Sequence, residues 1–110
     1  MIVKEVISDT DSVYNYMQDE LVLGYLEIRL VDGVVDIMNL FVSEDARRQG
    51  IATALMNEMI EKEDFNRIML EVKVNNNEAL KLYTKLGFKE ITLRERYYDE
   101  DTALIMEKVK

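Results

Sequence analysis

Six consecutive residues, Arg47 to Ala52 (RRQGIA), have side chains and backbone that suit an anion. They follow an apolar run, residues 36–42, and precede a helix-like stretch. Free N–H groups in the first turn of a helix attract an anion, and the helix dipole adds to that attraction. Gly50 lacks a Cβ, so a ligand can approach its backbone, and Arg47 and Arg48 can donate charged hydrogen bonds to a phosphate. The loop is either an ordinary strand-to-helix turn or a phosphate cradle.

The composition restricts the chemistry that such a site can perform. The chain has no cysteine, which excludes disulfides, thiolate zinc sites and cysteine nucleophiles. It has no histidine either, which removes the usual general base and the commonest transition-metal ligand. No metal site is predicted. Proton transfer must therefore come from aspartate, glutamate, lysine, tyrosine or bound water.

Length and charge define the class of protein. The 110 residues are 48% hydrophobic and 33% charged, which predicts a single globular domain spanning residues 1–110. A net charge of −8 argues against sequence-independent binding to nucleic acid. It suits a cationic partner such as an amine, a polyamine or a basic polypeptide, although acidity can also serve solubility alone. With no secretory signal and no apolar run of about 18 residues, we expect a cytoplasmic protein without membrane contact.

Alternating apolar residues predict an N-terminal group of strands. Residues 2–7 and 13–17 are extended stretches, and two longer arms flank Asp32-Gly33, a dipeptide typical of a two-residue hairpin. Each arm is expected to bury one face. The predicted inward residues are Val22, Gly24, Leu26, Ile28 and Leu30 in the first arm, and Val34, Met38, Leu40 and Val42 in the second.

Downstream of the loop, the spacing of apolar residues changes to that of a helix. A strand, a second helix and further strands follow. One apolar stripe comprises Ala52, Leu55, Met56, Met59 and Ile60, and a strand follows with Ile68, Leu70, Val72 and Val74 on its apolar face. Asn75, Asn76 and Asn77 offer caps for a second helix, with Glu78 placed for a capping box with Asn75, and the helix ends at Gly87. Strands over about 88–98 and 103–109 close the chain. This order predicts an α/β fold, a mixed sheet with crossover helices.

Three segments carry a resemblance to one family. Arg47, Gly50 and Ala52 match the Q/R-x-x-G-x-G/A signature with which the GNAT acetyltransferase superfamily binds the pyrophosphate of acetyl-CoA. Residues 70–88 (LEVKVNNNEALKLYTKLGF) look like the second half of that fold. Residues 93–108 (LRERYYDEDTALIMEK) resemble the closing hairpin of ribosomal-protein alanine N-acetyltransferases. The resemblance runs from about residue 23 to residue 108 and implies six to seven strands with two main helices.

The resemblance implies a coenzyme A site between two splayed strands. The backbone of one strand segment, Asn39 to Val42, would bind the pantetheine arm. The loop amides would hold the pyrophosphate, and an asparagine would contact the cofactor near the second helix. The implied cofactor-binding residues are Leu40, Phe41, Val42, Arg47, Arg48, Gln49, Gly50, Ile51, Ala52, Thr53 and Asn76. Without the resemblance, Asn76 is simply an N-cap.

The resemblance also implies the catalytic groups. Glu71 would accept the amine's proton, directly or through water, because an ammonium has no lone pair for attack. Tyr83 would protonate the leaving thiolate, and Tyr97 and Tyr98 would line the acceptor channel. On pattern alone, Glu71 is a solvated strand residue and Tyr83 is core packing. The implied activity is acetyl transfer from acetyl-CoA to a primary amine, most simply a protein N-terminus. The alternatives are a small-amine or polyamine acetyltransferase, and a non-catalytic acyl-CoA-binding module.

One departure from the family concerns the N-terminal region. Only five residues, SDTDS (8–12), separate the opening strand from the next extended stretch, so the one or two helices that the family places there are expected to be absent. These helices form a wall of the acceptor site in the family. The site is then open to a bulky substrate, completed by another subunit, or degenerate. Exposed apolar edges favour self-association, so a homodimer is expected.

Overall fold

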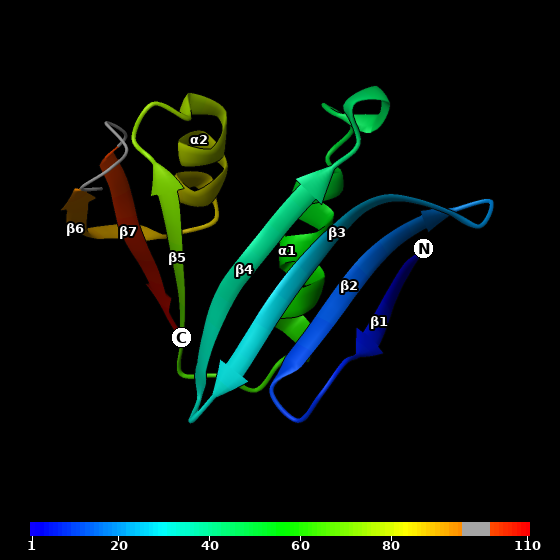
Figure 1. Ribbon diagram of the computed structural model, residues 1–110, viewed down its shortest axis with the longest axis horizontal. Coiled ribbons are helices and arrows are strands. Elements are labelled where there is room, and N and C mark those ends of the chain that lie inside the picture. Colours follow the sequence, from blue (N-terminus) through cyan, green and yellow to red (C-terminus); the bar gives the residue numbers. More distant parts are fainter. Residues whose placement is uncertain (96–101) are drawn as a thin grey trace.

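A computed structural model describes residues 1–95 and 102–110 of the protein. Its strands form one mixed seven-stranded sheet in the order β1-β2-β3-β4-β5-β7-β6, in which only β4 and β5 pair in parallel (Figure 1). The elements are β1 (Ile2–Val6), β2 (Asp11–Gln18), β3 (Leu21–Val31), β4 (Val34–Val42), a 3₁₀ turn (Glu44–Ala46), α1 (Ile51–Lys62), β5 (Arg67–Lys73), α2 (Asn77–Lys85), β6 (Lys89–Glu95) and β7 (Thr102–Val109). The predicted mixed sheet with two crossover helices is confirmed.

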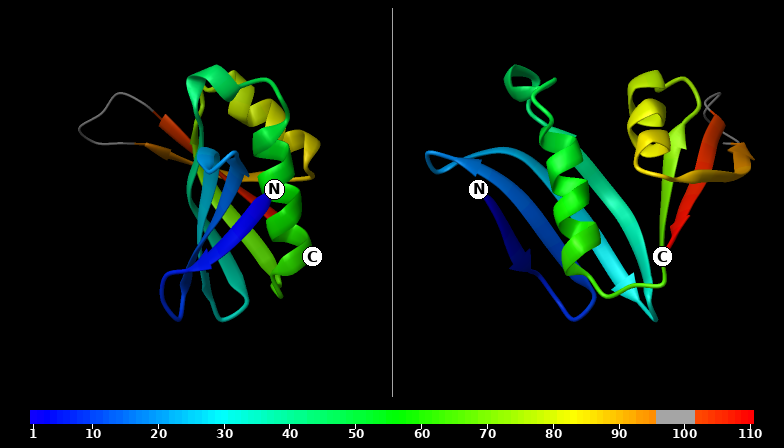
Figure 2. Two further views of the ribbon diagram at one scale, coloured as in Figure 1. Left: turned by 90° about the vertical axis from the view of Figure 1, so that its right-hand side faces the viewer. Right: turned by 180° about the vertical axis from the view of Figure 1, so that it is seen from behind.

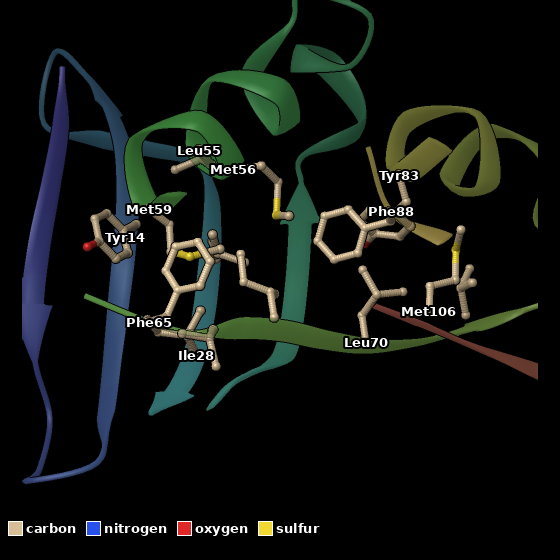
Figure 3. Packing of buried hydrophobic residues seen from close by; sticks show 14 of the residues in the cluster. Tyr14, Ile28, Leu55, Met56, Met59, Phe65, Leu70, Tyr83, Phe88 and Met106 are labelled. Carbon is tan, nitrogen blue, oxygen red and sulfur yellow. The ribbon is translucent and has the colours of Figure 1, made fainter. Parts of the chain in front are cut away.

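Both α-helices cover the same face of the sheet, as the edge-on view in Figure 2 shows. The core lies between them and the strands, and Figure 3 shows its side chains from close by. The fully buried members with the largest side chains are Tyr14, Leu26, Ile28, Val35, Leu55, Met56, Met59, Ile68 and Met106. Most residues of the predicted apolar stripe of α1 and of the apolar face of β5 contribute to this core. The exceptions are Ala52, which is outside the core cluster, and Val74, which is exposed.

The N-terminal strands are joined as the sequence predicts. Residues 7–10 connect β1 to β2 with no helix between them, and the two strands pair antiparallel. β1 is an edge strand, and Val3, Val6 and Ile7 are exposed. Among the described residues, no helix has the length and apolar character needed to cross a membrane.

A β-bulge in β4 reverses part of the predicted burial. Ile37 and Asn39 pair with consecutive residues of β3, so Met38 is an extra residue. Val35 is therefore fully buried, while Met38 is 45% exposed. The prediction that Val34 and Met38 face the core is wrong, because alternation cannot continue in phase through a bulge.

Gly24 in β3 determines where α1 rests on the sheet. A Cβ at Gly24 would lie 2.8 Å from the carbonyl oxygen of Phe41 and 3.1 Å from Cγ2 of Ile51. Ile51 is the first residue of α1 and is buried. The absence of a side chain on β3 thus lets the first turn of α1 pack directly against the sheet.

α2 begins one residue later than the predicted capping box requires. Its N-cap is Asn76, whose side chain accepts a hydrogen bond from the backbone N–H of Ala79 at 3.2 Å. The predicted pairing of Asn75 with Glu78 is therefore wrong by one position. Asn76 satisfies one of the N–H groups that a helix leaves without an internal partner.

A buried carboxylate ties β1 and β2 to the end of α1. The hydroxyl of Tyr14 donates a hydrogen bond to Oε2 of Glu63, and Nζ of Lys4 lies 2.7 Å from the same oxygen. The Glu63 side chain is only 8% exposed. Burial, followed by the hydrogen bond to Glu63, raises the pKa of the Tyr14 phenol. Removing one partner would leave a buried charge incompletely satisfied, which is costly.

We therefore expect Tyr14→Phe to lower the free energy of unfolding by about 2 kcal/mol, the usual cost of losing a hydrogen bond to a buried charged group. Urea denaturation measures this change. Tyr16→Phe is the matched control, since Tyr16 is a half-buried tyrosine of the same strand, and it should change stability by less than about 0.5 kcal/mol. Equal effects of the two substitutions would contradict the role given to the Glu63 contact.

Candidate active site

The site begins where two central strands separate. β4 and β5 pair only at Val34 with Arg67, Val35 with Ile68 and Asp36 with Met69. Beyond these pairs the strands diverge, as Figure 1 shows. A cleft of about 800 Å³ occupies the gap. A bulge bends the strand that carries it, so the bulge at Met38 provides a physical reason for the divergence.

The loop before α1 forms one end of this cleft. Gly50 is the N-cap of α1 and has left-handed backbone angles, φ 77° and ψ 15°. A Cβ there would meet no atom within 4 Å, so the requirement for glycine comes from conformation and not from crowding within the protein. The first N–H of α1 with a helical partner is that of Ala54, which bonds to the Gly50 carbonyl at 2.9 Å. The backbone N–H groups of residues 51–53 precede it and can donate hydrogen bonds to an anion.

The charges around the cleft favour an anion at this end. Its lining includes Arg47, Arg48 and Lys73 against Glu71 and Glu78, in a protein whose net charge is −8. Nε of Arg47 donates to the carbonyl of the last β4 residue at 3.1 Å, which fixes the loop to the strand end. Arg47 and Arg48 belong to the loop directly before α1, so their charges act where the helix dipole also attracts an anion.

Glu71 lies on the face of β5 that the helices leave uncovered. Its neighbours Leu70 and Val72 are buried beneath the helices, so Glu71 points to the opposite face, as predicted from alternation. Its side chain lines the cleft and is 31% exposed. Oε2 lies 3.3 Å from Nη1 of Arg94 in β6. The carboxylate can therefore reach both solvent and a molecule in the cleft.

Tyr83 approaches the same cleft from the helix-covered face. It lies in α2, is only 7% exposed, and packs edge-on against Phe88 with ring centroids 5.7 Å apart (Figure 3). Burial raises the pKa of its phenol. The hydroxyl is therefore protonated at neutral pH and can donate a proton.

The structure brings most of the predicted site residues together. Those that line the cleft are Leu40, Phe41, Val42, Arg47, Arg48, Gly50, Ile51, Ala52, Thr53, Glu71, Asn76 and Tyr83. Gln49 belongs to the same loop but is not among the lining residues, and its role stays a prediction. Tyr97 and Tyr98, predicted for the acceptor channel, lie outside the described residues.

Sequence reasoning missed several residues at the cleft. The additional lining residues are Ile37, Met38, Leu70, Val72, Lys73, Glu78, Ala79 and Leu82. It also missed Arg94, which contacts Glu71. Face alternation in β6 alone could not have found Arg94, because a register shift between Glu90 and Thr92 changes the phase relative to β7.

Residues 5–88 match the model of the Acetyltransferase (GNAT) family. The chain belongs to the GNAT acetyltransferase family. This match covers the splayed strands, the loop before α1, and both Glu71 and Tyr83. The predicted family is thereby confirmed.

Several GNAT proteins resemble this chain. An N-alpha-acetyltransferase of Saccharolobus solfataricus is 35% identical over 104 residues, which cover 87% of this chain and 62% of that protein. The chain thus spans about three fifths of that relative's length. The crystal structure of the ribosomal-protein-S18-alanine N-acetyltransferase from Escherichia coli superposes with a TM-score of 0.87 at 27% identity, covering 93% of this chain and 70% of that one. A GNAT acetyltransferase from Elizabethkingia anophelis with acetyl-CoA bound shares the fold, with a TM-score of 0.83 at 17% identity over 92% of this chain and 77% of that one.

The raised pKa of Tyr83 predicts how stability changes in alkali. Burial favours the neutral phenol of Tyr83 in the folded state. The contribution of this side chain to the free energy of unfolding is therefore fully present below the unfolded tyrosine pKa of about 10. The contribution is lost as the pH rises through the higher folded value. In an ultraviolet absorbance titration of the folded protein, we expect Tyr83→Phe to abolish the signal of one phenol whose pKa lies above the ordinary tyrosine value. Loss of a phenol that titrates near pH 10 would contradict this assignment.

Proposed function

We propose that this GNAT protein transfers an acetyl group from acetyl-CoA to a primary amine, the N-terminus of a protein. The observation that supports this most directly is the cleft between β4 and β5. It is lined by a helix N-terminus suited to an anion, by a carboxylate and by a protonated phenol. Acyl transfer to an amine needs these three functions together.

The cleft suits coenzyme A in shape and chemistry. A volume of about 800 Å³ lies within the usual range for ligand pockets. The loop amides of residues 51–53, with Arg47 and Arg48, would hold the pyrophosphate. The β4 backbone from Leu40 to Val42, which lies beyond the last β5 pair, would bind the pantetheine amides as a neighbouring strand does. When bound, acetyl-CoA supplies the activated acetyl thioester.

Two side chains would move the protons. Oε2 of Glu71 accepts the proton of the acceptor's ammonium, directly or through one water, and this exposes the nitrogen lone pair. The hydroxyl of Tyr83 holds the proton that the departing thiolate takes up. Because Glu71 and Tyr83 reach the cleft from opposite faces of the sheet, the acceptor and the cofactor can enter from different sides. This arrangement needs neither cysteine nor histidine, in keeping with the composition.

The proposed acceptor rests on the relatives and on charge. The names of the two most similar proteins described above specify N-alpha acetylation and a ribosomal protein's alanine. A net charge of −8 favours approach of a cationic partner, which fits a basic polypeptide and also a polyamine. An acceptor on a ribosomal protein would place the reaction in the cytoplasm. Comparing a peptide with N-terminal alanine against spermidine distinguishes the two acceptor classes.

We also propose that two copies associate through the β1 edge. β1 ends the sheet and exposes Val3, Val6 and Ile7, and such edges tend to pair with another chain. Sedimentation velocity at assay concentration should show a dimer, and Val3→Lys should shift it toward monomer. A monomer at every concentration tested would contradict this proposal.

The main test separates binding from turnover. We expect Glu71→Gln and Tyr83→Phe each to lower kcat about a hundredfold or more, the usual contribution of a general base or acid. Acetyl-CoA affinity by calorimetry should stay within about threefold, because neither proton is needed for binding. Release of free CoA in the presence of the alanine peptide measures turnover.

Glu78→Gln and Tyr16→Phe are the controls for this experiment. Glu78 also lines the cleft, so its variant tests whether any loss of charge there suffices. Both controls should retain activity. Tight acetyl-CoA binding without turnover in the unaltered protein would favour a non-catalytic acyl-CoA-binding module. Absence of acetyl-CoA binding would overturn the proposed function altogether.

A further inference from the structure

Arg94 contacts the carboxylate to which the acceptor amine must come. Nη1 of Arg94 lies 3.3 Å from Oε2 of Glu71, with side-chain exposures of 64% and 31%. The two residues come from different strands, β6 and β5, with β7 between them. The guanidinium thus carries a positive charge at the point where a protonated amine would also bring one.

The sheet register shows how Arg94 reaches across β7. Glu71 pairs with Ile105, and Arg94 pairs with Ala103, two residues away on the same face. Ala103 is fully buried although it lies on the face that the helices leave uncovered. A small side chain at this position of β7 leaves a path for the long arginine side chain. Cross-strand geometry therefore directs Arg94 toward the cleft.

The contact between Arg94 and Glu71 is one that another cation can readily displace. Arg94 contributes a single long hydrogen bond to an exposed partner, whereas Arg29 binds Asp11 through two bonds of 2.8 and 3.1 Å. Exposed single ion pairs contribute little to stability because solvent competes for both partners. The Arg94–Glu71 pair is thus poorly suited to hold the sheet together and well suited to be displaced.

We propose that Arg94 is a counter-ion that the acceptor's ammonium replaces on Glu71, so that it sets the affinity for cationic acceptors. This inference rests on the proposed function, in which Glu71 receives the acceptor's proton. At pH 7 most N-terminal amines are protonated, so the acceptor arrives with the same charge as the guanidinium. Both cations compete for the same carboxylate oxygens, and Arg94 also repels the acceptor from a short distance. Arg94 is therefore a specificity-determining residue outside the proton-transfer steps.

The test measures binding of a peptide with N-terminal alanine to the protein saturated with CoA, a complex in which no transfer takes place. We expect Arg94→Gln to lower the peptide Kd roughly two- to fivefold at low salt, the range of exposed ion pairs. The difference should shrink in high salt, because exposed charges are screened. Arg94→Lys keeps the charge and should remain near the unaltered value. The same peptide with an acetylated N-terminus lacks the ammonium and should gain nothing from Arg94→Gln.

Arg67→Gln is the matched control. Arg67 pairs with Glu107 at 3.6 Å, again between β5 and β7, but neither residue lines the cleft. A comparable gain in Arg67→Gln would show a general effect of surface charge and would overturn the proposal. An unchanged or higher peptide Kd in Arg94→Gln would overturn it as well. Failure of the unaltered protein to bind the peptide would overturn both this inference and the proposed acceptor. Intact peptide binding without turnover would contradict the proposed function alone.

Discussion

Parallel pairing between β4 and β5 stops after Asp36 and Met69, and the features of the site depend on that interruption. A sheet paired along its full length would satisfy the β4 backbone internally and leave no gap for a ligand. The bulge at Met38 bends β4 at the position where the separation begins. The backbone beyond it borders the cleft, where an extended ligand with amide groups can supply the hydrogen bonds of the missing strand. Gly24 then sets the first turn of α1 against the sheet, which brings the helix N-terminus to the open end of the same cleft.

The separation also divides the chemistry between two environments. Tyr83 lies on the helix-covered side, where burial keeps its phenol protonated. Glu71 lies on the uncovered side, where solvent and the Arg94 guanidinium reach its carboxylate. These two environments suit the acid role proposed for Tyr83 and the base role proposed for Glu71. The direct connection from β1 to β2 adds no helix on the uncovered side. Acceptor selection in this protein is therefore expected to depend on the sheet itself, through residues such as Arg94.

Features determined by local sequence could be predicted, and features determined by strand register could not. Most of the first helical stripe, the strand of Glu71 and the strand-to-helix loop with Gly50 at the helix start follow from periodicity and turn chemistry. The inward face of the first part of β4 was predicted wrongly, because a bulge depends on how two strands meet. The helix cap fell on Asn76 and not on Asn75, since three consecutive asparagines offer nearly equal choices. Arg94 was missed because its approach to Glu71 spans two strand pairings, one of them irregular.

We propose that the loop before α1 and the part of β4 that does not pair with β5 together bind acetyl-CoA. The most direct measurement is an amide NMR titration of the ¹⁵N-labelled protein with acetyl-CoA. We expect the largest shifts at Gly50, at residues 51–53 and at residues 40–42, while β1 and β2 stay unchanged. Saturable shifts at both segments at the same ligand concentration would show that one molecule spans the cleft. Shifts confined to other elements, or none at millimolar acetyl-CoA, would contradict binding of acetyl-CoA in this cleft.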